Sequence, residues 1–125
     1  MENLKIPATK YTLEVNLNAG TGILEMSGSS YPENAIDFFQ PIFDWIKIYL
    51  TQNPKKVVLK LKINYLNTSS AKCILDILEI LEQYYKEKNG DVSVNWYYAE
   101  EDEDILEMGE EIAEDTEIPF NLLSF

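Results

Sequence analysis

The sequence contains no histidine and no arginine, and it has a single cysteine. Without histidine, the chain cannot form a Ser-His-Asp triad, use a histidine general base or bind a metal through imidazole. One thiol, Cys73, can form neither an internal disulfide nor a zinc or iron–sulfur site, which is typical of a protein from a reducing compartment. We therefore predict a cytoplasmic protein that is not an enzyme and that uses no metal and no cofactor.

Long apolar runs are also missing, and the first residues lack the basic-then-apolar pattern of a signal peptide. We expect no association with a membrane. The chain has 125 residues, of which 46% are hydrophobic and 12% aromatic, which is enough to bury a core. The sequence predicts a single domain over residues 1–125 that ends in an acidic helix and tail, residues 100–125.

The net charge of −12 is unevenly distributed. Residues 1–99 contain all ten lysines and eleven acids, a balance of −1, whereas residues 100–125 contain eleven acids and no cation, a balance of −11. Contacts to nucleic-acid phosphates need clusters of Lys and Arg. This charge distribution therefore excludes a nucleic-acid-binding protein.

Hydrophobic periodicity indicates alternating strands and helices. Alternation predicts strands over residues 11–17, 24–27, 57–65 and 92–98. Helical spacing predicts helices over 35–50 and 68–88, followed by an acidic helix with Ile105, Met108 and Ile112 as its apolar stripe. Residues 28–34 are expected to form a loop, Pro41 to kink the first helix or begin its second half, and Asn89-Gly90 to end the second. The tail 118–125 is apolar enough to pack on the body of the domain.

This order, ββαβαβα, predicts the α/β class. A strand–helix–strand crossover makes the two joined strands parallel, while the initial hairpin is antiparallel, so the sheet is mixed. Because the strands alternate rather than being apolar throughout, we expect helices mainly on one face, in a two-layer sandwich. The other face, with Lys60, Lys62, Ser93 and Asn95, is then free for solvent or a partner.

Four hydrogen-bonding residues, Asn67, Thr68, Ser69 and Ser70, precede the apolar stripe of the second helix. One interpretation is a helix cap, in which Asn67 or Thr68 accepts from free backbone N–H groups. The other is a phosphorylated helix start, because a helix N-terminus favours an anion. A phosphate on Thr68 would lie one turn from the ammonium of Lys72.

Three blocks of the sequence carry a resemblance to a known family: SGSSYPENAIDFFQPIFDWI, NYLNTSSAKCILDIL and WYYAEEDEDILEMGEEI. Together, in this order, they resemble the SiaC family of bacterial regulatory phosphoproteins, whose architecture is similar to that of STAS domains. The resemblance implies partner switching. A cognate serine/threonine kinase phosphorylates Thr68, a PP2C-type phosphatase removes the phosphate, and the unphosphorylated form binds and activates an effector, in one branch a diguanylate cyclase involved in biofilm regulation.

The resemblance also draws attention to the loop Tyr31-Pro32-Glu33-Asn34. In structural terms, Pro32 fixes the approach to the first helix and Asn34 is a plausible cap for it. In functional terms, these four residues join Asn67, Ser69, Ser70 and Lys72 around Thr68 in the surface that contacts a partner.

The acidic run Glu100–Asp104 lacks the ligand spacing and glycine of an EF-hand loop, so we expect it to form a solvated helix start. It leaves one alternative function open. The chain could be a constitutive acidic adaptor that acts through residues 100–117, and its binding would then depend on salt but not on the state of Thr68.

Overall fold

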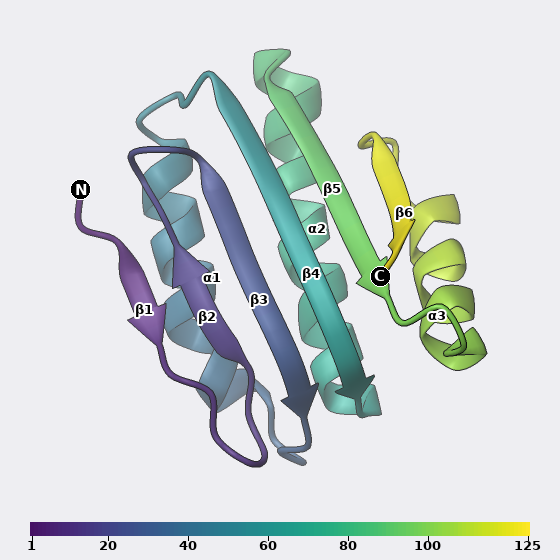
Figure 1. Ribbon diagram of the computed structural model, residues 1–125. Coiled ribbons are helices and arrows are strands. Elements are labelled where there is room, and N and C mark those ends of the chain that lie inside the picture. Colours follow the sequence, from purple (N-terminus) through teal and green to yellow (C-terminus); the bar gives the residue numbers. More distant parts are fainter.

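The computed structural model describes residues 1–125, and its six strands form one sheet with three helices (Figure 1). No helix has the length and apolar character needed to cross a membrane. In chain order the elements are β1 (Leu4–Ile6), β2 (Glu14–Leu17), β3 (Ile23–Ser30), α1 (Ile36–Leu50), β4 (Lys56–Leu66), α2 (Thr68–Lys88), β5 (Asp91–Tyr98), α3 (Glu103–Glu114) and β6 (Phe120–Ser124).

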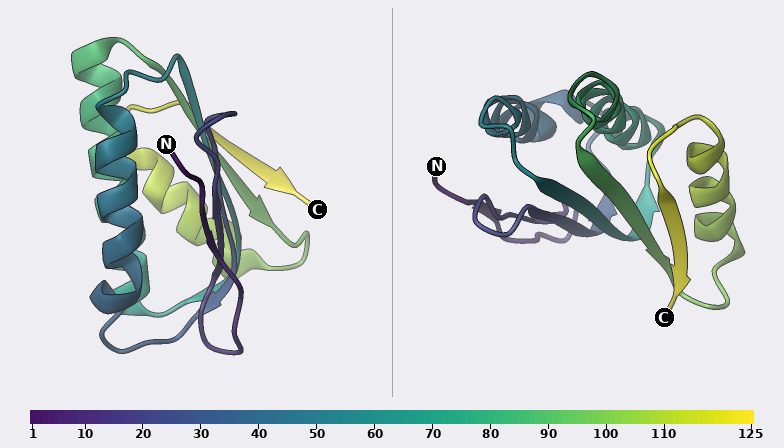
Figure 2. Two further views of the ribbon diagram at one scale, coloured as in Figure 1. Left: turned by 90° about the vertical axis from the view of Figure 1, so that its left-hand side faces the viewer. Right: turned by 90° about the horizontal axis from the view of Figure 1, so that it is seen from above.

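The strands lie in the sheet in the same order as in the chain, from β1 to β6. The pairs β1–β2 and β2–β3 are antiparallel, and β3, β4, β5 and β6 run parallel to one another. Helices α1 and α2 lie side by side on one face, and α3 lies on the same side near the β6 edge (Figure 2). The predicted class, a two-layer α/β sandwich with a mixed sheet, is confirmed.

The core lies between the sheet and the helices. Alternate residues of β4, Leu59, Leu61 and Ile63, are almost fully buried against the apolar stripes of α1 and α2. Helix α1 continues through Pro41, so the kink or restart expected there does not divide the helix. Helix α2 ends at Asn89, which has the left-handed conformation typical of a helix C-terminus.

The two edge strands, β1 and β6, were not predicted from the sequence, and with them the observed order is βββαβαβαβ. β1 has only three residues, and it is held by pairing with β2 and by the Trp45 Nε1–H group, which donates to the Glu2 carbonyl at 2.9 Å. β6 is the tail that was expected to pack on the body of the domain, and it does so as a fourth parallel strand beside β5. Short edge strands depend on their neighbours more than on their own sequence.

A β-bulge near the end of β4 corrects the assignment of Tyr65. Alternation placed Tyr65 on the buried face, in line with Leu61 and Ile63, but Gly28 pairs with Ile63 and Ser29 pairs with Tyr65, which leaves Asn64 as an extra residue. The side-chain pattern shifts by one from this point, so Tyr65 is exposed and Leu66 is buried. β3 also continues to Ser30 and so includes residues that were expected to form a loop.

Helix α3 approaches the sheet closely at Gly109. A Cβ atom at this position would lie 2.5 Å from Trp96 Cδ1, so only glycine lets the indole lie against the helix. The Trp96 Nε1–H group donates to the Ile105 carbonyl at 3.0 Å. The close contact between α3 and the sheet at Gly109 is therefore made with Trp96.

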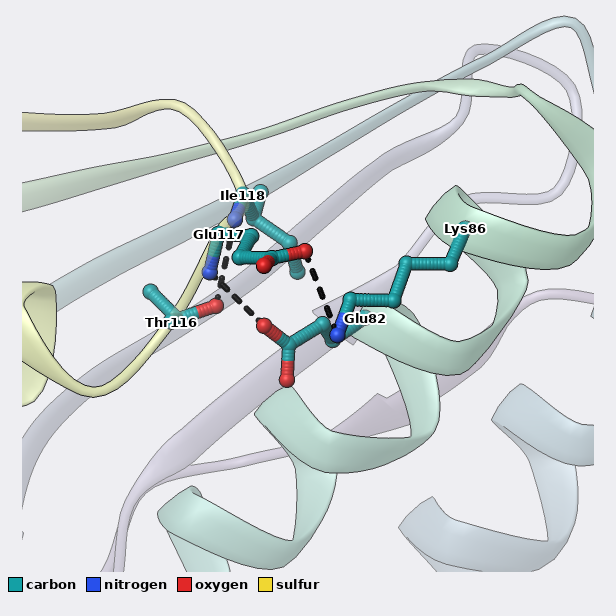
Figure 3. A network of polar contacts seen from close by, with 5 residues as sticks. All are labelled: Glu82, Lys86, Thr116, Glu117 and Ile118. Atoms are coloured by element: carbon teal, nitrogen blue, oxygen red, sulfur yellow. Dashed lines mark hydrogen bonds and ion pairs between the residues drawn. The ribbon is translucent and has the colours of Figure 1, made fainter.

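A polar network joins α2 to the segment that precedes β6 (Figure 3). Glu82 Oε1 accepts from the Glu117 backbone N–H at 2.7 Å, and Lys86 Nζ lies 3.1 Å from Glu117 Oε2. The hydrogen bond and charge of Glu117 raise the pKa of Lys86. These contacts fix the path by which the chain enters the last strand.

Candidate functional site

The candidate site lies where parallel strands β3 and β4 end and the helices that follow them begin, at the lower end of the molecule in Figure 1. Asn67 is the N-cap of α2: its Oδ1 atom accepts from the Ser70 backbone N–H at 2.9 Å. Its Nδ2 group donates to the carbonyls of Tyr31 and Pro32 at 2.8 and 3.0 Å. One side chain thus caps α2 and holds the loop that leads into α1.

The two serines of the cluster are also held by neighbouring groups. Ser69 Oγ accepts from the Ala35 backbone N–H at 3.1 Å. Ser70 is fully buried, and its hydroxyl lies 2.6 Å from the hydroxyl of Ser30, at the end of β3. Both hydroxyls therefore join β3 and α1 to the start of α2, and they have a structural use that does not involve a partner.

Thr68 differs from its three neighbours. Its side chain is exposed, and its hydroxyl makes no hydrogen bond within the protein, whereas Asn67, Ser69 and Ser70 all do. The capping interpretation is therefore correct for Asn67. The Thr68 hydroxyl forms no hydrogen bond that stabilises the fold. Among the four residues, Thr68 has the hydroxyl that an enzyme can reach without breaking a contact.

The loop Tyr31–Asn34 lies against the start of α2, as expected if these residues share a surface with Thr68. Tyr31, Glu33 and Asn34 are exposed, and Pro32 is half-buried. The expected capping role of Asn34 is wrong, because Ala35 occupies the N-cap position of α1 without a side-chain hydrogen bond. The Asn34 amide instead donates to Asp37 Oδ2 at 3.4 Å. The Ala35 N–H, which a cap at Asn34 would leave free, donates to Ser69 Oγ.

The electrostatic surroundings of Thr68 favour an added anion. The first turn of α2 has no acidic residue, whereas α1 has Asp37 and α3 has Glu103 and Asp104 in the corresponding turns. The positive end of the α2 dipole is thus not compensated by a neighbouring carboxylate. Lys72 is highly exposed and lies 3.8 Å from Asp76, one turn further along the helix, so it is weakly held and close to Thr68 in the helix.

Three exposed tyrosines adjoin this site, and their proximity to one another was not predicted from the sequence. The rings of Tyr31 and Tyr65 stack with centroids 4.8 Å apart, and Tyr11 meets Tyr31 edge to face at 6.2 Å. We call Tyr11, Tyr31 and Tyr65 the tyrosine cluster. Alternation could not reveal it, because the bulge at Asn64 is what turns Tyr65 out of the core.

Other candidate groups have structural explanations. Cys73 is buried near the start of α2, and burial, with a smaller contribution from Asp76, raises the pKa of its thiol. Asp102, within the acidic run, caps α3 by accepting from the Ile105 N–H at 3.1 Å. An open groove of about 570 Å³ lies between α1 and α2, and neither Thr68 nor its neighbours in the sequence line it.

Comparisons with known proteins agree with the resemblance seen in the sequence. A family model described as SiaC family regulatory phosphoprotein matches residues 6–125. An uncharacterised protein of Pseudomonas aeruginosa (strain UCBPP-PA14) is 38% identical over 120 residues, which cover 96% of this chain and 94% of that protein.

Solved structures of SiaC from Pseudomonas aeruginosa have the same fold. Apo-SiaC superposes with a TM-score of 0.91 at 36% identity, over 98% of this chain and 99% of that one. SiaC in complex with the diguanylate cyclase SiaD, which it activates, superposes with a TM-score of 0.92 at 36% identity, over the same shares of the two chains.

Proposed function

The chain belongs to the SiaC family of regulatory phosphoproteins, and we propose that it is a switch whose binding to an effector is controlled by phosphorylation of Thr68. In this proposal its role is regulatory rather than catalytic, and it acts in the cytoplasm. The unphosphorylated form binds and activates the effector, and the phosphate prevents that binding.

The observation that supports Thr68 most directly is its isolation within the cluster. Its hydroxyl is exposed and forms no hydrogen bond, while the hydroxyls of Ser69 and Ser70 hold the starts of two helices. Phosphorylation of Thr68 therefore breaks no existing contact, and the N-terminal end of α2 tolerates the negative charge. We propose that Lys72 turns toward the phosphate from its weak contact with Asp76.

The proposed mechanism is occlusion of the docking surface. A phosphate adds about 1.5 to 2 negative charges and a tightly held hydration shell at a helix start that has no acidic side chain. A partner that covers Thr68 would have to remove that water and bury the phosphate without supplying an opposing charge of its own. We propose that Asn67, Ser69, Lys72 and the loop Tyr31, Pro32, Glu33 and Asn34 form the rest of this surface. Ser70, which was expected to belong to it, is fully buried and can only support it from inside the domain.

We propose three partners for the switch: a cognate serine/threonine kinase, a PP2C-type phosphatase and an effector. The complex of SiaC with SiaD supports a diguanylate cyclase as the effector, because that SiaC covers nearly the whole of this chain at 36% identity. The kinase and the phosphatase are expected from the family resemblance.

The test is to incubate the purified protein with its cognate kinase and to locate the phosphate by peptide mass spectrometry. We expect one phosphate on Thr68, none on Thr68→Ala and full labelling of Thr68→Ser, which keeps a hydroxyl at the same position. The phosphorylated protein should no longer bind its diguanylate cyclase, while Thr68→Ala should bind it before and after kinase treatment. Full labelling of Thr68→Ala, or equal binding by both forms of the wild-type protein, would refute the proposal.

The alternative, a constitutive acidic adaptor acting through residues 100–117, rests on a separate observation. Glu100, Glu101, Glu103 and Asp104 are exposed, and only Asp102 in this run has a capping duty. An adaptor of this kind would bind its partner more weakly as the salt concentration is raised, and its binding would not depend on whether Thr68 is phosphorylated. Measuring binding of both phosphorylation states at low and high salt separates the two functions.

A further inference from the structure

We propose that the tyrosine cluster is the surface on which the effector docks, and that it binds an uncharged, apolar patch of that effector. This inference rests on the proposed function. It adds where on the protein the effector binds and what kind of surface the effector presents. Tyr11, Tyr31 and Tyr65 are exposed to 59%, 47% and 44% of their surface, although their rings are already packed against one another.

A contiguous patch of exposed aromatic rings is typical of an interaction surface. Aromatic side chains bury large areas when they are covered, and Tyr and Trp are the residues most enriched at the energetic centres of interfaces. Here three rings from separate segments, the turn before β2, the end of β3 and the end of β4, form one continuous patch. Covering them would remove apolar surface from water while their hydroxyls still reach hydrogen-bond partners at the rim.

The cluster is held in place before any partner arrives. The Tyr31 backbone N–H donates to the Tyr11 carbonyl at 2.9 Å, and Thr9 Oγ1 accepts from the Tyr11 backbone N–H at 3.2 Å. Tyr65 is fixed by the bulge in β4 and by stacking on Tyr31. Ordering flexible side chains costs free energy on binding, so a patch that is already ordered binds more tightly for the same area.

The charge around the cluster indicates the chemistry of the partner. In a chain of net charge −12, residues 1–99, which include the tyrosine cluster, carry a balance of only −1. Lys10, whose ammonium lies 5.8 Å from the Tyr11 ring centroid, and the exposed Glu33, two residues after Tyr31, carry opposite charges beside the cluster. Lys62, on the same sheet face, lies over the Phe125 ring at 4.2 Å. A neutral surface is best matched by a neutral one.

Contact between the cluster and the phosphorylation site explains how the switch would work. Asn67, next to Thr68, donates to the backbone carbonyl of Tyr31, so the acceptor threonine is one residue from a direct contact with the segment that carries the cluster. A phosphate placed there brings charge into a region that the effector must dehydrate. A basic partner would be attracted by the same phosphate, so only an uncharged or acidic partner is released by it.

The experiment is to purify the diguanylate cyclases of the host, find the one that binds the unphosphorylated protein, and titrate it with variants. We expect Tyr31→Ala and Tyr65→Ala to weaken binding about tenfold or more. Tyr65→Phe keeps the ring and should change binding less than about twofold. Ile48→Ala is the control, because Ile48 is equally exposed but lies near the end of α1, away from Thr68. Tyr11→Ala, in an exposed turn, extends the test if a strand variant unfolds.

The salt dependence gives a second readout. Binding through a neutral apolar patch should change less than about threefold between low and high salt, whereas an interface of opposite charges weakens steeply. Wild-type affinity in Tyr31→Ala and Tyr65→Ala would overturn the inference, as would variants that alter only the rate of Thr68 phosphorylation or only self-association. The proposed function fails separately, if phosphorylation of wild-type protein leaves cyclase binding unchanged.

Discussion

The backbone N–H of Ala35 donates to Ser69 Oγ at 3.1 Å, so the start of α1 is hydrogen-bonded to the start of α2. These two residues are 34 positions apart in the chain. Their contact means that the loop between β3 and α1 cannot move independently of the helix that carries Thr68. A partner that touches this region meets one preformed surface rather than two separate loops.

Asn67 and Thr68 should differ sharply in their effect on stability. Asn67→Ala removes the cap of α2 and leaves the Tyr31 and Pro32 carbonyls without their donor, so we expect a loss of about 2 kcal/mol. Thr68→Ala removes no hydrogen bond and should change stability by less than about 0.5 kcal/mol. Urea denaturation of the two variants tests this. An equal loss in both would mean that Thr68 also serves as a cap.

The buried hydroxyl pair Ser30 and Ser70 should behave as a coupled unit. Removing either hydroxyl leaves the other buried with one partner fewer, at an expected loss of about 1 to 3 kcal/mol. The double variant Ser30→Ala/Ser70→Ala removes both polar groups, so its loss should be smaller than the sum of the single losses. A double-mutant cycle from chemical denaturation measures the difference, and strict additivity would contradict the coupling.

The sequence predicted the class of fold and the elements with long, regular patterns. α1, α2, β4 and β5 have clear periodicity, because one face of each is buried throughout. The exposure of Tyr65 was not predicted, because a bulge depends on how two strands pair. Pairing is not visible in the alternation of either strand alone.

The candidate site was predictable in part. The types and order of Asn67, Thr68, Ser69 and Ser70 indicated a helix start, and the family resemblance indicated the acceptor threonine. The sequence could not show which of the four residues form hydrogen bonds within the fold. The partners of Ser70 and Ser69 are Ser30 and Ala35, which lie far away in the sequence. The prediction of Asn34 as a cap failed for the same reason, since the start of α1 is held by Ser69 of another helix, which accepts from the Ala35 N–H.

Gly109 should be the least replaceable position of α3. An alanine there brings its Cβ to 2.5 Å from Trp96 and 2.8 Å from Leu122, so either the helix or the indole must move. We expect Gly109→Ala to cost about 1 to 3 kcal/mol through overpacking, despite the better helix propensity of alanine. Glu110→Ala, at the exposed neighbour, is the matched control and should be nearly neutral. A stabilised Gly109→Ala would show that α3 can shift freely.

Cys73 should make the protein less stable in mild alkali. Burial raises the pKa of its thiol above the ordinary value of 9.0, so the folded state keeps the proton to a higher pH than the unfolded state. The stabilisation is therefore present below the ordinary pKa and is lost as pH rises toward the folded one. As pH rises above about 9, Cys73→Ala should lose less stability than wild type. Equal losses would mean that the thiol ionises alike in both states.

The order of the strands bears on how the chain can assemble during its synthesis. Each strand from β2 to β6 adds beside the strand made just before it, and none must insert between two strands that are already paired. The growing chain can therefore extend its sheet from one edge to the other as it leaves the ribosome, with each new helix covering the sheet already formed. On this route the junction that holds Thr68 is completed once α2 has emerged, before β5, α3 and β6 have been translated.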